Sequence, residues 1–183
     1  MLIGIEHVRI EPGNTVVTPL DFYDYPFSHS FLGAIVWALA LGLLYFAFRR
    51  YARGAWLVGV CVFSHWILDA IVHRPDLPLI PWINIYIGFG LWNSLVASVV
   101  VEFGLFFIGV VLYLRTTVAQ SRSGKFGLWS LIVVLVIIWL ANIFGPPPPS
   151  EKAIAVVGNA SWLFVLCAYW IDHHRKIYSG FAT

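Results

Sequence analysis

Histidine and aspartate recur at four-residue intervals in one apolar segment of the chain, where residues 64–76 include His65, Asp69 and His73. Positions four apart on an α-helix differ by only about 40° around its axis, so the three side chains are expected on one face. Imidazole nitrogens and carboxylate oxygens are ligands of zinc and similar divalent ions. The spacing therefore predicts a metal site. A structural His–Asp hydrogen bond, with His73 as an interfacial residue, is the alternative.

Three further residues are candidates for the chemistry of this site. His29 would supply a fourth ligand from another segment, unless it caps the helix that begins there. Arg74 is a candidate for binding a phosphate or another anion. Asp76 is a candidate general base, a ligand of a second ion, or a partner that orients His73. If one coordination position stays open, a bound water made more acidic by the metal could attack an ester or phosphoester.

The composition places these residues in a membrane protein. The chain has 183 residues, of which 60% are apolar and 11% charged, and a mean hydropathy of +0.84; soluble domains are about 25% charged. A bilayer crossing takes about 20 residues. Five stretches are long enough: 28–48, 54–73, 89–114, 126–145 and 153–171. We predict an all-α polytopic membrane bundle over 28–171, an extracytoplasmic segment 1–27 and a cytoplasmic tail 172–183.

Basic residues predict the orientation of the bundle. Eight of them fall on one side if the five segments alternate: Arg49, Arg50, Arg53, Arg115, Arg122, Lys125, Arg175 and Lys176. Arg9, Arg74 and Lys152 fall on the other side. The positive-inside rule therefore predicts that the His–Asp site faces the extracytoplasmic side of the membrane. No basic run suggests nucleic acid as a partner. Cys61 and Cys167 are interpreted as packing residues rather than a disulfide.

Other polar residues within the apolar stretches are expected to lie in the outer half of the bundle, near the histidines: Asn93, Ser94, Asn142 and Asn159. Glu102 lies near the middle of the third stretch and is a candidate base, proton-relay group or cross-bundle partner. His173 and His174 follow the last stretch on the opposite side from the cluster. They are interpreted as interface anchors, with cytoplasmic metal binding as the alternative.

Three motifs carry a family resemblance: Pro-Phe-Ser-His-Ser (26–30), Ser-His-x-x-x-Asp-x-x-x-His-x-Pro-Asp-x-Pro (64–78) and Gly-Leu-Trp-Asn-Ser (90–94). They resemble bacterial membrane-bound metal-dependent hydrolases near the LexA-regulated inner-membrane hydrolases. The H-x-x-x-D spacing is also loosely similar to zinc-dependent phospholipases C. The resemblance implies a divalent metal, zinc above all, bound through His29, His65, Asp69, His73 and Asp76. The chain lacks the Gly-His segment and the Asp-bearing helix expected upstream in such proteins.

These observations lead to one main functional expectation and two alternatives. The main expectation is a metal-dependent hydrolase acting on a phosphoester or lipid-linked ester, with membrane lipids and a lipid-linked substrate as its partners. The absent upstream segment favours the first alternative, a non-catalytic subunit of a larger membrane complex that packs against other membrane subunits. The second alternative is ion or proton passage with Glu102 as a relay, but the apolar inner half of the bundle offers no polar path.

Overall fold

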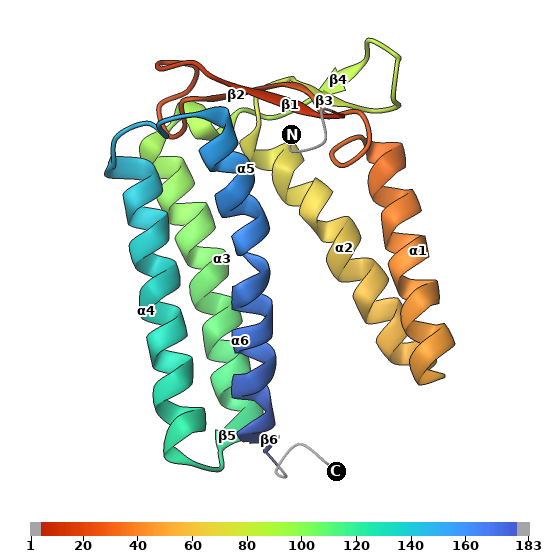
Figure 1. Cartoon of the computed structure of the whole chain (residues 1–183), viewed down its shortest axis with the longest axis vertical. Helices are drawn as coiled ribbons and strands as arrows, with labels where there is room; N and C mark the ends of the chain where they lie inside the picture. Colours follow the sequence, from red (N-terminus) through yellow and green to blue (C-terminus); the bar gives the residue numbers. More distant parts are fainter. Residues whose placement is uncertain (1–4, 179–183) are drawn as a thin grey trace. The chain divides into compact units, whose positions relative to one another are not determined.

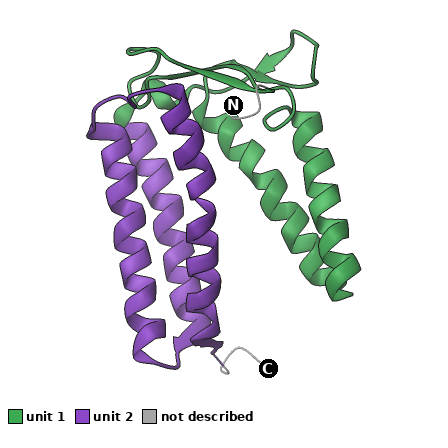
Figure 2. Cartoon of the chain, in the orientation of Figure 1, with its two compact units in different colours: residues 1–95 green, residues 96–183 purple. Residues whose placement is uncertain are grey.

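The computed structural model describes residues 5–178 and contains five helical spans long and apolar enough to cross a membrane. The chain divides into two compact units, Met1–Leu95 and Val96–Thr183, shown in green and purple in Figure 2. Each unit is described by itself. The spans confirm the predicted polytopic helical bundle. Most of their large apolar side chains are exposed in the isolated chain, as expected of helices that face lipid.

Unit 1 is a helix pair with two small hairpins at one end (Figure 1). Its elements are β1 (His7–Ile10), β2 (Leu20–Asp24), α1 (Phe31–Arg49), α2 (Ala52–Val72), β3 (Leu77–Pro78), β4 (Tyr86–Ile87) and the 3₁₀ helix η1 (Leu91–Asn93). Strands β1 and β2 are antiparallel, with Arg9 opposite Asp21, and β3 pairs with β4. The segment 1–27, for which the sequence predicted no strands, therefore contains a hairpin in its described part.

Small residues let α1 and α2 approach closely. Ala38 and Gly42 on α1 face Ala55 and Gly59 on α2, and a Cβ added to Gly42 would lie 3.1 Å from the Ala55 carbonyl oxygen. Small residues four apart are the usual seam of packed membrane helices, because lipid supplies no hydrophobic drive for the contact and close packing must provide it. The two helices diverge from this seam toward the hairpins (Figure 1), and Phe31 at the start of α1 contacts Trp66 of α2, next to His65.

The end of the helix pair that carries the hairpins is stabilised by a small core and by the N-cap of α1. Ala34, Trp66, Ala70 and Leu77 form a buried cluster. Ser30 is the N-cap of α1 and accepts a hydrogen bond from the Gly33 backbone N–H, a cap typically worth about 1 kcal/mol. The N-cap is thus Ser30, so the alternative that His29 caps this helix is wrong.

Unit 2 consists of α3 (Leu95–Thr116), β5 (Thr117–Ala119), α4 (Arg122–Phe144), α5 (Glu151–Ala160), α6 (Trp162–His173) and β6 (Arg175–Ile177). Strands β5 and β6 are antiparallel and join the end of α3 to the end of α6. The predicted fifth span is two helices in one line of 23 residues, interrupted at Ser161. Its hydroxyl bonds to the Gly158 carbonyl, and a side chain that competes for helix carbonyls in this way favours a break.

The described part of the predicted tail 172–183 contains regular secondary structure. Asp172 and His173 belong to α6, and Arg175–Ile177 form β6. Arg175 is buried, donating to the Thr117 hydroxyl and to the Gly124 carbonyl. Residues 179–183 lie outside the described part of the chain. The basic residues of unit 2 therefore include one that ties the tail to α4 rather than facing solvent.

Substitution of Gly124 by alanine is expected to destabilise unit 2. A Cβ there would lie 2.1 Å from the His174 carbonyl oxygen, which is backbone and cannot move without displacing β6. Overpacking of this kind costs about 1–3 kcal/mol of unfolding free energy. Unfolding of the purified protein in detergent measures the loss. Gly104→Ala is the control, since nothing lies within 4 Å of the added atom; equal stability of the two variants would contradict the contact.

Candidate metal centre

Three of the predicted metal ligands lie close together. His65 and Asp69 lie one turn apart on α2, and His29, the residue before the N-cap of α1, lies beside them from the turn before that helix. His65 Nε2 lies 3.1 Å from Asp69 Oδ2 and 3.5 Å from His29 Nε2, and His29 Nε2 lies 3.8 Å from the same Oδ2. One ligand atom from each residue thus falls in a group no wider than 4.8 Å.

The triangle of donor atoms has the dimensions of a metal coordination face. Ligand atoms about 2.0–2.1 Å from a tetrahedral zinc lie about 3.3 Å from one another, and the three distances above span that value. Asp69 Oδ2 is buried and accepts no hydrogen bond from the described residues, even with His65 Nε2 3.1 Å away. The two imidazole nitrogens are also within hydrogen-bond distance of each other, at 3.5 Å, so all three ligand atoms lie in one compact group. A buried acceptor without a donor costs about 1–3 kcal/mol unless something else binds it.

The three donors differ in their exposure. The side chains of Asp69 and His29 are 13% and 24% exposed, whereas that of His65 is 60% exposed in the isolated chain. The protected donors are therefore on one side of the group and the accessible donor on the other.

The backbone and ring of His29 are held on several sides. The Trp66 indole N–H donates to the His29 carbonyl at 2.9 Å, and the Tyr25 ring packs on the imidazole with centroids 4.8 Å apart. Ser28 Oγ lies 2.5 Å from His29 Nδ1. Burial lowers the pKa of His29 below its ordinary value, against the opposing effect of the Asp69 carboxylate. The neutral imidazole, which is the form that binds metals, is thereby favoured.

His73 does not join the other donors, although the four-residue spacing predicted that it would. Helix α2 ends at Val72, and His73 has extended backbone angles, so its side chain leaves the helical face. The ring is buried between Phe22 and Trp92, at centroid distances of 4.8 and 4.6 Å. Its Nδ1 lies 3.0 Å from Asp76 Oδ1. Pro75, two residues later, is consistent with the helix ending here.

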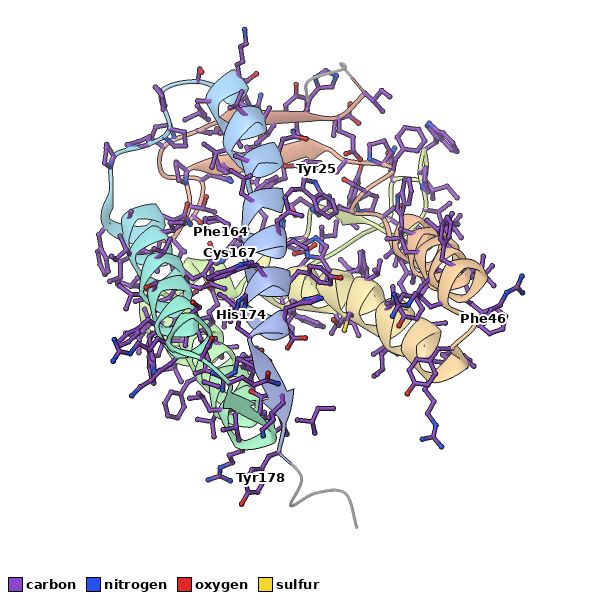
Figure 3. The ribbon with its side chains drawn as sticks, turned by 60° about the horizontal axis from the view of Figure 1, so that its bottom comes forward. Tyr25, Phe46, Phe164, Cys167, His174 and Tyr178 are labelled. Atoms are coloured by element: carbon purple, nitrogen blue, oxygen red, sulfur yellow. The ribbon has the colours of Figure 1, made fainter. Side chains whose placement is uncertain are left out.

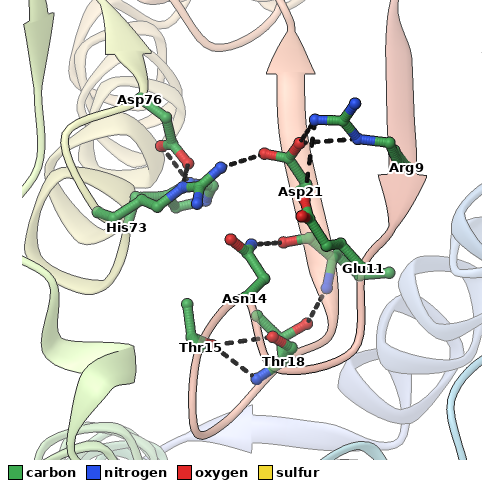
Figure 4. A network of polar contacts seen from close by, with 10 residues as sticks. Arg9, Glu11, Asn14, Thr15, Thr18, Asp21, His73 and Asp76 are labelled. Carbon is green, nitrogen blue, oxygen red and sulfur yellow. Dashed lines mark hydrogen bonds and ion pairs between the residues drawn. The ribbon is translucent and has the colours of Figure 1, made fainter.

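Arg74 and Asp76 belong to a charged network that links the hairpin β1–β2 to the end of α2 (Figure 4). Asp21 is 2% exposed and accepts hydrogen bonds from both Arg9 and Arg74. Arg74 Nε also donates to Asp76 Oδ2 at 3.2 Å, and the other oxygen of Asp76 lies at His73. Two carboxylates hold the Arg74 guanidinium. In this state of the protein it supports the fold around the site.

Several residues near the cluster were missed by reasoning from the sequence. Tyr25 is 4% exposed, and its buried hydroxyl has no hydrogen-bond partner among residues 5–178. Figure 3 labels it near the end of β2. Burial raises the pKa of this hydroxyl, and the carboxylates of Glu6, Asp76 and Asp69 raise it further. Glu6 and Asp21 also serve the site region. Their only sequence signal is that they are charged residues in a segment next to an apolar helix.

The remaining polar candidates fall in different surroundings. Asn93 ends η1 in unit 1. Glu102 accepts a hydrogen bond from the Trp139 indole N–H at 2.7 Å, which matches the predicted cross-bundle partner. Asn142 and Asn159 belong to unit 2, so their approach to the histidines stays a prediction; the Asn159 amide donates to the Ala155 carbonyl of its own helix. His173 and His174 each place Nδ1 2.9 Å from a carbonyl of α6. Both cysteines are free.

The five spans and the hairpin-capped helix pair define the class of protein: a multi-pass helical membrane protein. The family described as YdjM inner membrane protein matches residues 25–145, more than half of the chain, and the chain belongs to that family. The protein is therefore a multi-pass inner-membrane protein. The matched range contains His29, His65 and Asp69. No curated protein and no solved structure matches the chain.

Proposed function

We propose that His29, His65 and Asp69 bind a divalent metal ion, zinc by the chemistry of its donors, and that the protein is a metal-dependent hydrolase of the inner membrane. One observation carries the proposal. Three donor atoms, two from α2 and one from His29 in the turn before α1, form a triangle with edges of 3.1, 3.5 and 3.8 Å, and one of them is a buried carboxylate oxygen with no hydrogen bond from the described residues. Two imidazoles and a carboxylate are a common ligand set of catalytic zinc.

The three ligands have separate tasks in this proposal. Asp69 supplies the negative charge that offsets the cation from a protected position, and His29 supplies a neutral nitrogen held by its surroundings. His65 is the accessible ligand, at the side where a substrate would enter. A divalent ion with three protein ligands supplies Lewis acidity and a nucleophilic water near neutral pH when it is bound. That chemistry suits the hydrolysis of an ester or phosphoester.

The depth of the site supports a membrane-associated substrate. Asp69 and His65 lie three and seven residues before the end of α2 at Val72, which corresponds to about 5 and 10 Å along the helix. That range is the boundary between lipid headgroups and acyl chains. Arg49, Arg50 and Arg53 lie at the other end of the same helix pair, so the positive-inside rule orients the site toward the extracytoplasmic side. A lipid or a lipid-linked ester places its hydrolysable bond at this depth.

Arg74 and Asp76 act as supporting residues in the proposed site. Arg74 is bound to Asp21 and Asp76, and Asp76 also contacts His73. An arginine engaged by two carboxylates is poorly placed to bind a phosphate unless one contact opens. The direct catalytic roles predicted for Arg74 and Asp76 require such an opening on substrate binding.

Metal content and hydrolysis test the proposal together. Full-length protein purified in detergent without added metal is expected to contain about one zinc or similar ion per chain, and to regain one after chelation and dialysis. We expect it to hydrolyse a chromogenic phosphodiester or a short-chain nitrophenyl ester, with loss of activity after chelation. The two substrates separate phosphoesterase from esterase activity. A folded protein that binds no transition metal, even on titration, would overturn the metal site, and metal binding without hydrolysis would overturn the enzyme.

A further inference from the structure

We propose that Ser28 and Glu6 are positioning residues that fix the tautomer of His29 and so present its Nε2 lone pair to the metal. The inference rests on the proposed metal site. The three groups form a continuous chain: Ser28 Oγ lies 2.6 Å from Glu6 Oε2 and 2.5 Å from His29 Nδ1. The far ring nitrogen, Nε2, is the atom that faces Asp69 and His65.

Proton bookkeeping along this chain gives a single arrangement. Glu6 Oε1 accepts the backbone N–H groups of Phe27 and Ser28 at 3.0 and 2.7 Å. A carboxylate surrounded by donors is acceptor-only. Ser28 has one hydroxyl proton, which it donates in its hydrogen bond to Glu6 Oε2. The serine oxygen can then only accept from His29, so Nδ1 carries the imidazole proton and Nε2 is left with its lone pair.

The arrangement resembles the outer shell of known metal sites, with a serine inserted. Histidine ligands usually donate the distal ring N–H to a carboxylate, a carbonyl or water, which fixes the tautomer and raises the basicity of the ligand. Here a carboxylate acts through a hydroxyl. The neighbouring serine has a different task, since Ser30 caps α1 through the Gly33 N–H. The order Ser28-His29-Ser30 thus divides two tasks between two serines on either side of a ligand.

Glu6 gives the N-terminal segment a function at the site. It precedes β1 and reaches the start of α1 across 22 residues of sequence. Its two bonds to backbone N–H groups fix the turn that carries Ser28 and His29. The loss of Ser28 alone leaves these backbone bonds in place, so Ser28→Ala separates the effect on the tautomer from the effect on the fold.

The experiment compares Ser28→Ala, Ser28→Thr and the wild type in the full-length, metal-stripped protein titrated with Zn²⁺ against a chelating indicator. Loss of an outer-shell partner weakens metal binding by about 10- to 100-fold, and we expect this for Ser28→Ala. Threonine keeps the hydroxyl and should restore binding to within about threefold. Ser64→Ala is the matched control, because Ser64 also precedes a site histidine, and within the described chain its hydroxyl bonds to the Cys61 carbonyl of its own helix alone.

A second measurement needs no metal and keeps the two proposals distinguishable. Long-range ¹H–¹⁵N spectra of histidine-labelled, metal-free protein report which nitrogen of His29 carries the proton, with the signal assigned by His29→Gln. We expect protonated Nδ1 in the wild type and in Ser28→Thr, and a shift toward protonated Nε2 in Ser28→Ala. Unchanged zinc affinity in Ser28→Ala, or an Nε2–H tautomer in the wild type, would overturn the inference. Absence of zinc binding with the expected tautomer would overturn only the metal site.

Discussion

Asp69→Asn is expected to abolish metal binding without weakening the metal-free fold. The substitution keeps the volume of the side chain and removes the charged oxygen that sits between the two histidines. Because Asp69 is a direct ligand in the proposed site, the loss of affinity should exceed the 10- to 100-fold that an outer-shell partner contributes. Elemental analysis of the purified variant, followed by Zn²⁺ titration, measures the effect.

The stability of the same variant decides between a ligand and a structural ion pair. Asp69 Oδ2 is buried and receives no hydrogen bond from the described residues, so the carboxylate lowers the unfolding free energy of the metal-free protein. The unfolding free energy of metal-free Asp69→Asn in detergent should therefore equal that of the wild type or rise by about 1 kcal/mol. A structural His65–Asp69 pair predicts the opposite: a drop in stability and no change in metal content. That outcome would contradict the proposed site.

The helical spans could be predicted from sequence because membrane insertion depends on properties that are local in the chain. About 20 apolar residues are enough to define a span, and the bounds of the first helix differ from the expected 28–48 by a few residues. The hairpin β1–β2 was missed because its stability does not come from an alternation of apolar and polar residues along its strands. It is held by Asp21, whose partners lie on another strand and after another helix.

Helical periodicity predicts which site residues lie together only as far as the helix continues. The pairing of His65 with Asp69 follows from one turn of continuous helix, and His29 was correctly placed nearby from its position at the helix start. His73 obeyed the same spacing, but the helix ends one residue before it. A single residue past a helix end changes the direction of a side chain more than any drift along the helix. Tyr25 and Glu6 reach the site through contacts distant in sequence, which no spacing reports.

Asp21→Asn is expected to have the opposite pattern of effects to Asp69→Asn: a large loss of stability with metal binding retained. Asp21 is the most buried charge in the network, and its two oxygens accept from two different arginines. Breaking a fully buried ion pair costs about 3–5 kcal/mol. The side chains of Arg9 and Arg74 are 57% and 38% exposed, so water will screen part of the loss, and we expect about 2 kcal/mol.

The matched control for Asp21→Asn is Asp24→Asn, three residues along the same strand. In the described part of the chain, the structure shows no ion pair or hydrogen bond of the Asp24 side chain, so its substitution should change stability by less than about 0.5 kcal/mol. Equal effects of the two variants would show that lost charge, rather than the network, matters.

A double-mutant cycle apportions the network between its two arms. Arg74 joins the hairpin to the residues after α2, whereas Arg9 joins only the two strands of the hairpin. If Asp21 fixes the hairpin on the helix pair, Asp21→Asn and Arg74→Gln should show a coupling energy of about 1 kcal/mol, larger than that of Asp21 with the more exposed Arg9. The folded fraction of each variant should still bind about one metal ion, because two of the three donors come from α2 and the third, His29, is tied to Trp66 of the same helix. A stronger coupling to Arg9 would instead confine the role of Asp21 to the hairpin.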